Sequence, residues 1–481
     1  MKTNKFFQNN KKALVAFMSA TVLSVGFTAC SQDDELFESA VPKNPTELTR
    51  GGSGLTPISY VERSWDGSKV VSTVKSVNDY IELGKARDDL FRLESGKWYV
   101  VKSNYETDII LAPKGEPANL IICDGVTLKS CIGIDAGHSL NIFSQEKDCG
   151  TLISKNERLA DYDAAGGPDL GYYPAIGGKD SMGKLVIHGG TITATSLDKY
   201  FSGIGGGSDG SGGDVTIYGG TIKAQGGKDA AGIGSGEEQH NDVNGGTLTV
   251  YGGTIEARGG MFGAGIGGGQ DADGGKVNIY GGTVKAWGGK DAAGIGCGEQ
   301  LEDDIVDGGY LTIHGGTVEA RGGDHGAGIG GGQDAHGGEV IVNGGKVSAF
   351  GGTDAAGIGS GEGYTECSLD GGTLLVNGGD VFADGSGWGA GIGGGEDAKG
   401  AKVFIYGGKV VAWAGDNAGK KNGSAIGSED GDGRRGSLTL GDNMQVHAGQ
   451  NPDNARKHLF PFETRVPACF FRPYTCVEVR N

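Results

Sequence analysis

The chain has 481 residues, of which 98 are glycine and only 11 are proline. A glycine share about three times the usual value of roughly 7% excludes an ordinary helical or doubly wound enzyme domain. The glycines occur in pairs rather than at every third residue, so a collagen triple helix is excluded as well. With 42 basic and 60 acidic residues the net charge is −18, which argues against nucleic acid or an anionic lipid surface as a partner.

The N-terminus has the pattern of an export signal. Four lysines precede an apolar stretch at 13–27, and Thr28-Ala29-Cys30 forms a small-residue cleavage site that ends in cysteine. This order predicts a lipoprotein signal peptide over residues 1–29 and a lipid-modified Cys30, with a plain secretory signal cleaved nearby as the alternative. The acidic run 33–35 resembles the export tag of Bacteroidetes surface lipoproteins, which implies a lipid-anchored outer-membrane protein that faces the cell exterior. Residues 30–56 are expected to form a flexible tether.

A repeated segment fills most of the remaining chain. It has the form apolar-x-apolar-x-Gly-Gly-Thr-apolar-x-Ala, and an Ile-Gly pair recurs in step with it from Ile176 to Ile426. The residue after the glycine pair marks the copies: Thr191, Thr221, Thr254, Thr283, Thr317, Lys346, Asp380 and Lys409. The spacing alternates between 29 or 30 and 33 or 34 residues, so the true unit is a pair of coils.

Each copy contains two short stretches with period-two alternation and no helical rhythm. Strands this short cannot bury an apolar face alone, but stacked copies can close a core between them. One inward column is expected to alternate valine and leucine from Val215 to Leu438, and another is alanine from Ala224 to Ala412. We therefore predict an all-β fold: a right-handed parallel β-helix (solenoid) over residues 96–448, between small N- and C-terminal caps at 57–95 and 449–481.

The repeats also carry a family resemblance. The Gly-Gly-Thr-Ile-x-Ala and Ala-Gly-Ile-Gly-Gly-Gly motifs follow an opening segment with Gly96-Lys97-Trp98-Tyr99 and Asp124-Gly125-Val126-Thr127. Together they resemble a group of secreted surface proteins of gut bacteria, and the chain is similar in outline to carbohydrate-binding β-helix lipoproteins of Bacteroidetes. The resemblance implies a polysaccharide or a host glycan as the partner, and it brings no catalytic signature.

A binding site for a polymer is expected on the outward columns, since the fold alone does not define a function. One edge should carry aromatic, histidine or arginine side chains in most coils: Arg258, Phe262, Trp287, Arg321, His325, Phe350, Trp388 and Trp413. With a coil spacing of about 4.8 Å, like positions two coils apart lie about 10 Å apart, close to the length of an extended disaccharide. These side chains either form a glycan-binding platform or stack on one another at the corner.

Acidic loops lengthen every second coil after the Ile-Gly pair. Carboxylates that recur along one axis could hold Ca²⁺, the one cofactor considered, because this ion takes six to eight oxygen ligands. The residues considered as ligands are Asp271, Asp273, Glu299, Asp303 and Asp334. Solvated loops that keep the coils soluble are the favoured alternative.

Two further functions fit the same architecture: a β-helix polysaccharide lyase or glycoside hydrolase, and a non-catalytic structural adhesin or spacer. Catalysis requires one asymmetric group of residues with shifted pKa values, whereas nearly every polar feature of this chain recurs from coil to coil. Binding by a monomer without catalysis is therefore the favoured interpretation. The residues to test for catalysis are Glu302, Asp303, Asp304 and Arg321.

Cysteines suggest limited cross-linking in an oxidising compartment. Cys469 and Cys476 lie seven positions apart near the C-terminus and predict a disulfide within the C-terminal cap. Cys123, Cys131 and Cys149 allow one more pair, whose partners the sequence leaves open.

Overall fold

The structure is a computed structural model of the chain. It describes residues 56–84, 90–156, 173–239, 242–301, 306–363, 369–415, 424–428, 436–442, 444–449, 465–467 and 476–480. All of these belong to one compact unit, Gly54–Asn481; the predicted signal peptide, Cys30 and nearly all of the tether lie outside the described residues. The described residues form strands, turns and coil but no helix, which confirms the all-β prediction.

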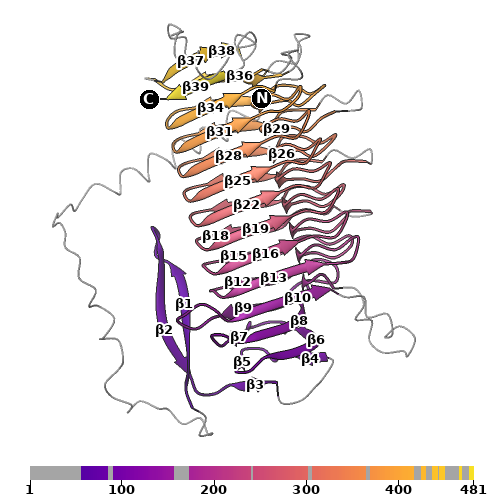
Figure 1. Ribbon diagram of the computed structural model, residues 1–481, viewed down its shortest axis with the longest axis vertical. Coiled ribbons are helices and arrows are strands. Elements are labelled where there is room, and N and C mark those ends of the chain that lie inside the picture. Colours follow the sequence, from indigo (N-terminus) through magenta and orange to yellow (C-terminus); the bar gives the residue numbers. More distant parts are fainter. Residues whose placement is uncertain are drawn as a thin grey trace, which may run out of the picture. The chain divides into compact units, whose positions relative to one another are not determined.

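Successive coils pair strand with strand to form long parallel ladders (Figure 1). The first sheet contains β3 (Ile81–Leu83), β5 (Trp98–Val101), β7 (Ala118–Ile122), β9 (Ser139–Phe143), β12 (Lys184–Ile187), β15 (Asp214–Ile217), β18 (Thr247–Val250), β21 (Lys276–Ile279), β24 (Tyr310–Ile313), β27 (Glu339–Val342), β30 (Thr373–Val376), β33 (Lys402–Ile405), β36 (Ser437–Leu440) and β38 (Arg465–Pro467).

The other two ladders follow the first sheet in each coil. The second sheet contains β4 (Leu90–Arg92), β6 (Tyr105–Leu111), β8 (Thr127–Gly133), β10 (Thr151–Asn156), β13 (Thr191–Ser196), β16 (Thr221–Gln225), β19 (Thr254–Arg258), β22 (Thr283–Trp287), β25 (Thr317–Arg321), β28 (Lys346–Phe350), β31 (Asp380–Asp384), β34 (Lys409–Trp413), β37 (Gln445–Gly449) and β39 (Cys476–Arg480). The third ladder consists of two-residue strands: β11 (Ile176–Gly177), β14 (Ile204–Gly205), β17 (Ile233–Gly234), β20 (Ile266–Gly267), β23 (Ile295–Gly296), β26 (Ile329–Gly330), β29 (Ile358–Gly359), β32 (Ile392–Gly393) and β35 (Ile426–Gly427).

The core consists of columns of like side chains, one from each coil. In-register pairing stacks Val215 on Leu248 in the first sheet and Ala224 on Ala257 in the second. Every member of the valine–leucine column and of the alanine column is at most 4% exposed. The fold is thus the predicted parallel β-helix solenoid, and its interior is filled by neighbouring coils that interdigitate.

The third ladder explains why the Ile-Gly pair recurs. Gly296 has a φ of 146°, and a Cβ atom built on it would lie 1.8 Å from the carbonyl oxygen of Gly330 in the next coil. A side chain at this position would therefore collide with backbone that is fixed by the ladder. Glycine lets consecutive coils approach closely at this face.

A hairpin of β1 (Ile58–Trp65) and β2 (Val70–Val77) lies along the outer face of the first sheet (Figure 1). The backbone N–H of Val61 donates to the carbonyl oxygen of Ser144 at 2.9 Å. Further along β1, the Trp65 ring lies 5.1 Å from that of Tyr251 and 5.5 Å from that of Tyr280. The predicted N-terminal cap therefore contains this hairpin on the flank of the sheet together with the first strand of each sheet, β3 and β4.

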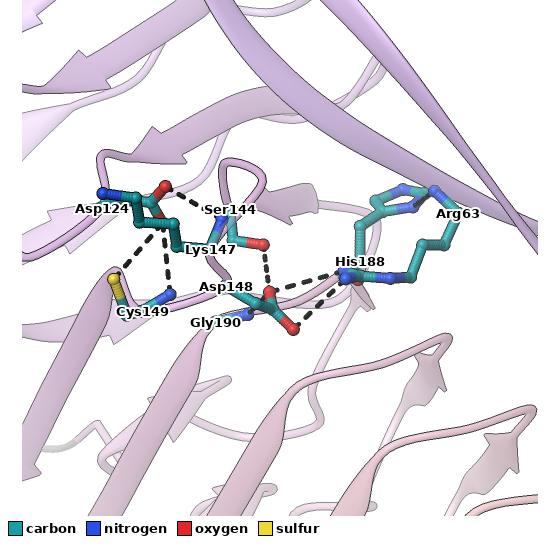
Figure 2. A network of polar contacts seen from close by, with 8 residues as sticks. All are labelled: Arg63, Asp124, Ser144, Lys147, Asp148, Cys149, His188 and Gly190. Carbon is teal, nitrogen blue, oxygen red and sulfur yellow. Dashed lines mark hydrogen bonds and ion pairs between the residues drawn. The ribbon is translucent and has the colours of Figure 1, made fainter. Parts of the chain in front are cut away.

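Arg63 on β1 connects the hairpin to the coils through contacts with His188 and Asp148 (Figure 2). Its backbone N–H donates to Nδ1 of His188 at 3.0 Å, and its guanidinium donates to the His188 carbonyl oxygen and pairs with Asp148 at 3.2 Å. Asp148 also accepts the backbone N–H of Gly190 at 2.7 Å and the hydroxyl of Ser144. Burial lowers the pKa of His188 to about 4, so the ring is neutral and its Nδ1 can act as an acceptor.

At the other end the pairing changes direction. Strand β38 pairs antiparallel with β36, and β39 pairs antiparallel with both β34 and β37. Strand β38 pairs with the last coil strand of the first sheet, and β39 lies between β34 and β37, so the edges of β36 and β34 are not left open to another chain. Within the predicted C-terminal cap they are the strands that the structure describes.

Candidate functional site

The final residues of consecutive second-sheet strands form one outward line, which we call the arginine–aromatic column. Strand register sets its members side by side in the order Arg258, Trp287, Arg321, Phe350, Asp384 and Trp413. The predicted binding residues that end a second-sheet strand therefore all lie on one face of the solenoid. They are Arg258, Trp287, Arg321, Phe350 and Trp413.

Within this column the aromatic faces are used by the protein itself. The guanidinium carbon of Arg258 lies 3.9 Å from the centroid of the Trp287 ring, and that of Arg321 lies 4.0 Å from the Phe350 ring. Because each arginine belongs to the coil next to its ring, the ring planes face along the stacking direction. This arrangement matches the self-stacking alternative, with a cation–π interaction worth about 0.5–1 kcal/mol at exposed positions.

A second line, the corner column, runs four residues before each Ile-Gly pair. Its members alternate between an aromatic ring and an aspartate: Tyr200, Asp229, Phe262, Asp291, His325, Asp354 and Trp388. Backbone hydrogen bonds hold neighbouring corners together, as from Phe262 N–H to the Lys228 carbonyl at 3.0 Å. Only the rings of this column were predicted from the sequence, although the motif Asp-Ala-Ala-Gly-Ile-Gly marks all three aspartates.

The rings of the corner column are half-buried, and two of them contact charged groups of adjacent coils. Nζ of Lys228 lies 4.8 Å from the centroid of the Phe262 ring. Nε2 of His325 lies 3.6 Å from Asp291 Oδ1, and its Nδ1 contacts a carboxylate oxygen of Glu362. His325 is therefore shared between carboxylates of two coils.

Each aspartate of the corner column is followed eight residues later by a glutamate. We call these pairs the acidic seam: Asp229 with Glu237, Asp291 with Glu299, and Asp354 with Glu362. Five of the six side chains are at most 8% exposed, and Asp354 is half-buried. Burying carboxylates close to one another is unfavourable unless protons, cations or hydrogen-bond donors compensate.

Glu299 shows this lack of compensation most clearly. Its pKa is raised to about 7, first by burial and then by the carboxylates of Asp291, Asp271 and Asp334. Its Oε2 atom is buried and has no hydrogen-bond partner. A carboxylate in this state takes up a proton or a cation more readily than an ordinary glutamate.

The proposed calcium ligands divide between two surroundings. Asp271 and Asp334 lie close enough to Glu299 to influence its pKa, and Asp271 N–H donates to the Glu299 carbonyl at 2.8 Å. Asp273 is engaged elsewhere, because its carboxylate accepts the backbone N–H of Asp307 at 2.8 Å. Three residues considered for metal binding or catalysis lie outside the described part of the chain: Glu302, Asp303 and Asp304.

The outer face of the first sheet carries a separate stack, which we call the aromatic ladder. Its members are Phe143, His188, Tyr218, Tyr251, Tyr280 and His314, with neighbouring ring centroids 4.3–5.4 Å apart and ring planes within 22° of parallel. The ring faces cover one another, and the hairpin covers part of the stack. The ladder therefore stabilises the fold and offers ring edges rather than faces to a ligand.

The cysteine side chains that the structure describes carry free thiols. This holds for Cys123, Cys131 and Cys149, so the pair that the sequence allowed among them is not formed. Burial raises the pKa of Cys131 to about 12, which makes its thiol unreactive. Of the predicted C-terminal disulfide, Cys469 lies outside the described residues, and the structure does not describe the side chain of Cys476.

Comparison with known proteins agrees with the fold. A family model described as a beta helix repeat matches six segments of the chain, residues 185–208, 215–237, 248–270, 277–299, 311–333 and 340–362. These six segments lie within the stacked coils, so the match is similarity to beta-helix repeats over this part of the solenoid. No curated protein and no solved structure matches it. In the described part of the chain no helix has the length and apolar character of a membrane span.

Proposed function

We propose that the chain is a cell-surface lipoprotein that binds an extended polysaccharide or host glycan along the corner of its β-helix. The observation that carries this proposal is the corner column, in which Phe262, His325 and Trp388 recur at every second coil. At about 4.8 Å per coil they lie about 10 Å apart, which corresponds to one extended disaccharide. A periodic protein surface suits a periodic polymer, because each added disaccharide repeats the same contacts.

The two columns would contribute different interactions. Phe262 and Trp388 are half-buried at the surface and would pack against pyranose rings. Arg258 and Arg321 are exposed, and their guanidinium faces already lie on Trp287 and Phe350. Nε of Arg321 donates to Glu319 at 2.9 Å, and the other N–H groups of the two guanidinium edges would hydrogen-bond sugar hydroxyl or carboxylate groups.

Binding without catalysis is preferred over a lyase or hydrolase activity. The Asp–Glu pair recurs three times along the seam, whereas a catalytic centre is a single asymmetric group. A structural adhesin or spacer would need neither the aromatic periodicity nor the exposed arginines.

A glycan array with the purified chain tests the proposal, followed by affinity measurements on the polysaccharide that binds. The double variant Phe262→Ala, Trp388→Ala should bind at least tenfold more weakly. Tyr406→Ala is the matched control, since Tyr406 is an exposed ring on the first sheet and should not affect affinity. Absence of any bound glycan, or equal affinity of the double variant, would refute the proposal, and release of shortened or unsaturated sugars would indicate an enzyme instead.

The membrane part of the proposal has its own test. Cells that express the chain are fed an alkyne-tagged fatty acid, and intact cells are treated with protease. Incorporation of the tag that depends on Cys30, together with protease sensitivity on intact cells, is the expected result. Tag incorporation that persists in Cys30→Ser, or full protection from protease, would contradict a surface lipoprotein.

A further inference from the structure

The three pairs of the acidic seam occupy equivalent places in successive coil pairs. In every case the next coil donates a backbone N–H to the carbonyl oxygen of the aspartate at 2.8 Å. The donor and acceptor residues are Gln270 and Asp229, Gln333 and Asp291, and Glu396 and Asp354. The third pair therefore has a carboxylate at a position where the first two have a neutral amide.

The cations beside the pairs also differ. At the first pair, Nζ of Lys199 lies 2.6 Å from Asp229 Oδ2. At the second pair, Nζ of Lys290 lies 3.5 Å from Asp291 Oδ1. At the third pair, Thr353 stands directly before the aspartate, in the place that Lys290 has at the second.

The third pair is therefore the most negative of the three. Relative to the second pair it has lost one positive charge, the lysine, and gained one negative charge, the glutamate. Charges of one sign placed in a largely buried corner disfavour the folded state unless another ion neutralises them. The same substitutions would be expected if a bound cation took over the role of the lysine.

The geometry of the third pair fits such an ion. Asp354, Glu362 and Glu396 each present a carboxylate oxygen, and these oxygens lie within 4.8 Å of one another. The second pair has its own indication of a cation site, because Glu299 is only 6% exposed and its buried Oε2 has no hydrogen-bond partner. His325 connects the two pairs through its contacts with Asp291 and Glu362.

We propose that the acidic seam binds calcium, with one site at Asp354, Glu362 and Glu396 and a second, weaker site at Asp291 and Glu299. Calcium accepts six to eight oxygen ligands at about 2.3–2.6 Å in flexible geometry, whereas magnesium demands near-ideal octahedral geometry and keeps several of its waters. A set of carboxylate oxygens is also a poor choice for zinc or copper, which prefer nitrogen and sulfur. Of the calcium ligands considered from the sequence, this proposal retains only Glu299.

Calcium binding is tested by titrating the chelator-treated full chain with CaCl₂ alone in a calorimeter, so the result does not depend on any glycan. We expect two sites. Glu396→Gln should weaken the tighter one at least tenfold, and because it installs the amide already present at the other two pairs, the variant should fold. Asp380→Asn is the matched control, since it removes an equal charge from an exposed position at the start of β31, in the same coil, and should leave both sites unchanged.

A second pair of variants separates the two sites. Thr353→Lys restores the lysine of the earlier pairs and should abolish the tighter site, while Glu299→Gln should remove the weaker one only. Terbium gives an independent signal, because Trp388, whose backbone N–H donates to Asp354 Oδ1 at 3.2 Å, should sensitise its emission. No binding below millimolar calcium, or unchanged affinity and emission in Glu396→Gln and Thr353→Lys, would overturn the proposal; a single site in the unsubstituted chain would overturn its second half.

Discussion

The aromatic ladder and the acidic seam are built by the same repeat, but neighbouring side chains attract one another in the ladder and repel one another in the seam. In the ladder, like groups that stack at about 4.3–5.4 Å attract one another, so each added coil strengthens the column. In the seam, like groups are carboxylates, so each added pair makes the next one less favourable. The ladder completes its contacts within the protein, whereas the seam needs partners in the form of lysine, histidine, protons or a bound cation.

The comparison shows how a solenoid separates stability from function. Stacking turns any position of the repeat into a column, so a self-attracting side chain at that position stabilises the fold. A self-repelling side chain at a buried position is tolerated only where something compensates it. Columns of the second kind are therefore the better candidates for ligand sites in repeat proteins.

The largest expected effect concerns the middle of the ladder. Tyr251→Ala removes ring contacts with Tyr218, Tyr280 and Trp65, and should lower the free energy of unfolding by about 3 kcal/mol. Urea unfolding followed by circular dichroism measures the loss. Tyr251→Phe keeps the stack and should change stability by less than about 0.5 kcal/mol. If the alanine variant is as stable as the phenylalanine variant, the ladder is not the stabilising region.

The second prediction concerns pH at the ladder. Burial holds the pKa of His188 at about 4 in the folded chain, below its ordinary value of 6.5. Between these values the unfolded chain binds more protons, so stability is complete above pH 6.5 and falls by about 2 kcal/mol as the pH drops to 4. Hydrogen exchange in peptides from β1, β9 and β12 should show this slope. His188→Asn, which keeps an acceptor for Arg63 but does not titrate, should remove the slope.

The seam should have the opposite slope. The pKa of Glu299 is raised from 4.5 to about 7, so between these values the folded chain binds more protons than the unfolded chain. Stability near β23 should therefore fall by about 1–2 kcal/mol as the pH rises from 4.5 to 8 in chelator. Glu299→Gln should flatten the dependence. After correction for the intrinsic rate, hydrogen exchange should slow with rising pH at the aromatic ladder and become faster at the acidic seam. Exchange that slows at both would contradict the opposite pH dependence predicted for the two regions.

The smallest expected effect lies at the arginine–aromatic column. Arg258→Ala removes one exposed cation–π contact with Trp287 and should reduce stability by about 0.5–1 kcal/mol. Tryptophan fluorescence during urea unfolding follows this change. A decrease in the free energy of unfolding of more than about 2 kcal/mol would mean that the arginine–aromatic column stabilises the fold as the aromatic ladder does.

The architecture could be predicted because it depends on positions that repeat. Ala320 and Ile329 lie in columns that recur in neighbouring coils, and period-two alternation alone tells which side chains point inward. The hairpin could not be predicted in the same way. Its attachment rests on Arg63, which meets His188 from 125 positions away, and no periodicity relates the two.

The candidate site was predictable only in part. The alignment of Trp287 with Arg321 follows from the repeat, but the ring orientation that lets arginine cover the aromatic face depends on side-chain rotamers. Glu299 was considered from the sequence, but its pairing with Asp291 was missed because the two residues lie eight positions apart on either side of the Ile-Gly strand. From the sequence alone, Asp291 and Glu299 look like solvent-exposed loop residues. The adjacent coils bury them.

The hairpin also determines how the molecule would respond to mechanical load. β1 begins at Ile58 and contacts coils from β9 to β21 through Val61, Arg63 and Trp65. Tension applied to the chain ahead of β1 would first shear this long contact along the solenoid before it could peel the first coil away. Under shear, these contacts carry the load together, whereas in peeling they break one after another. A chain pulled at its N-terminus by flowing fluid would therefore keep its coils stacked at forces high enough to peel off a single strand.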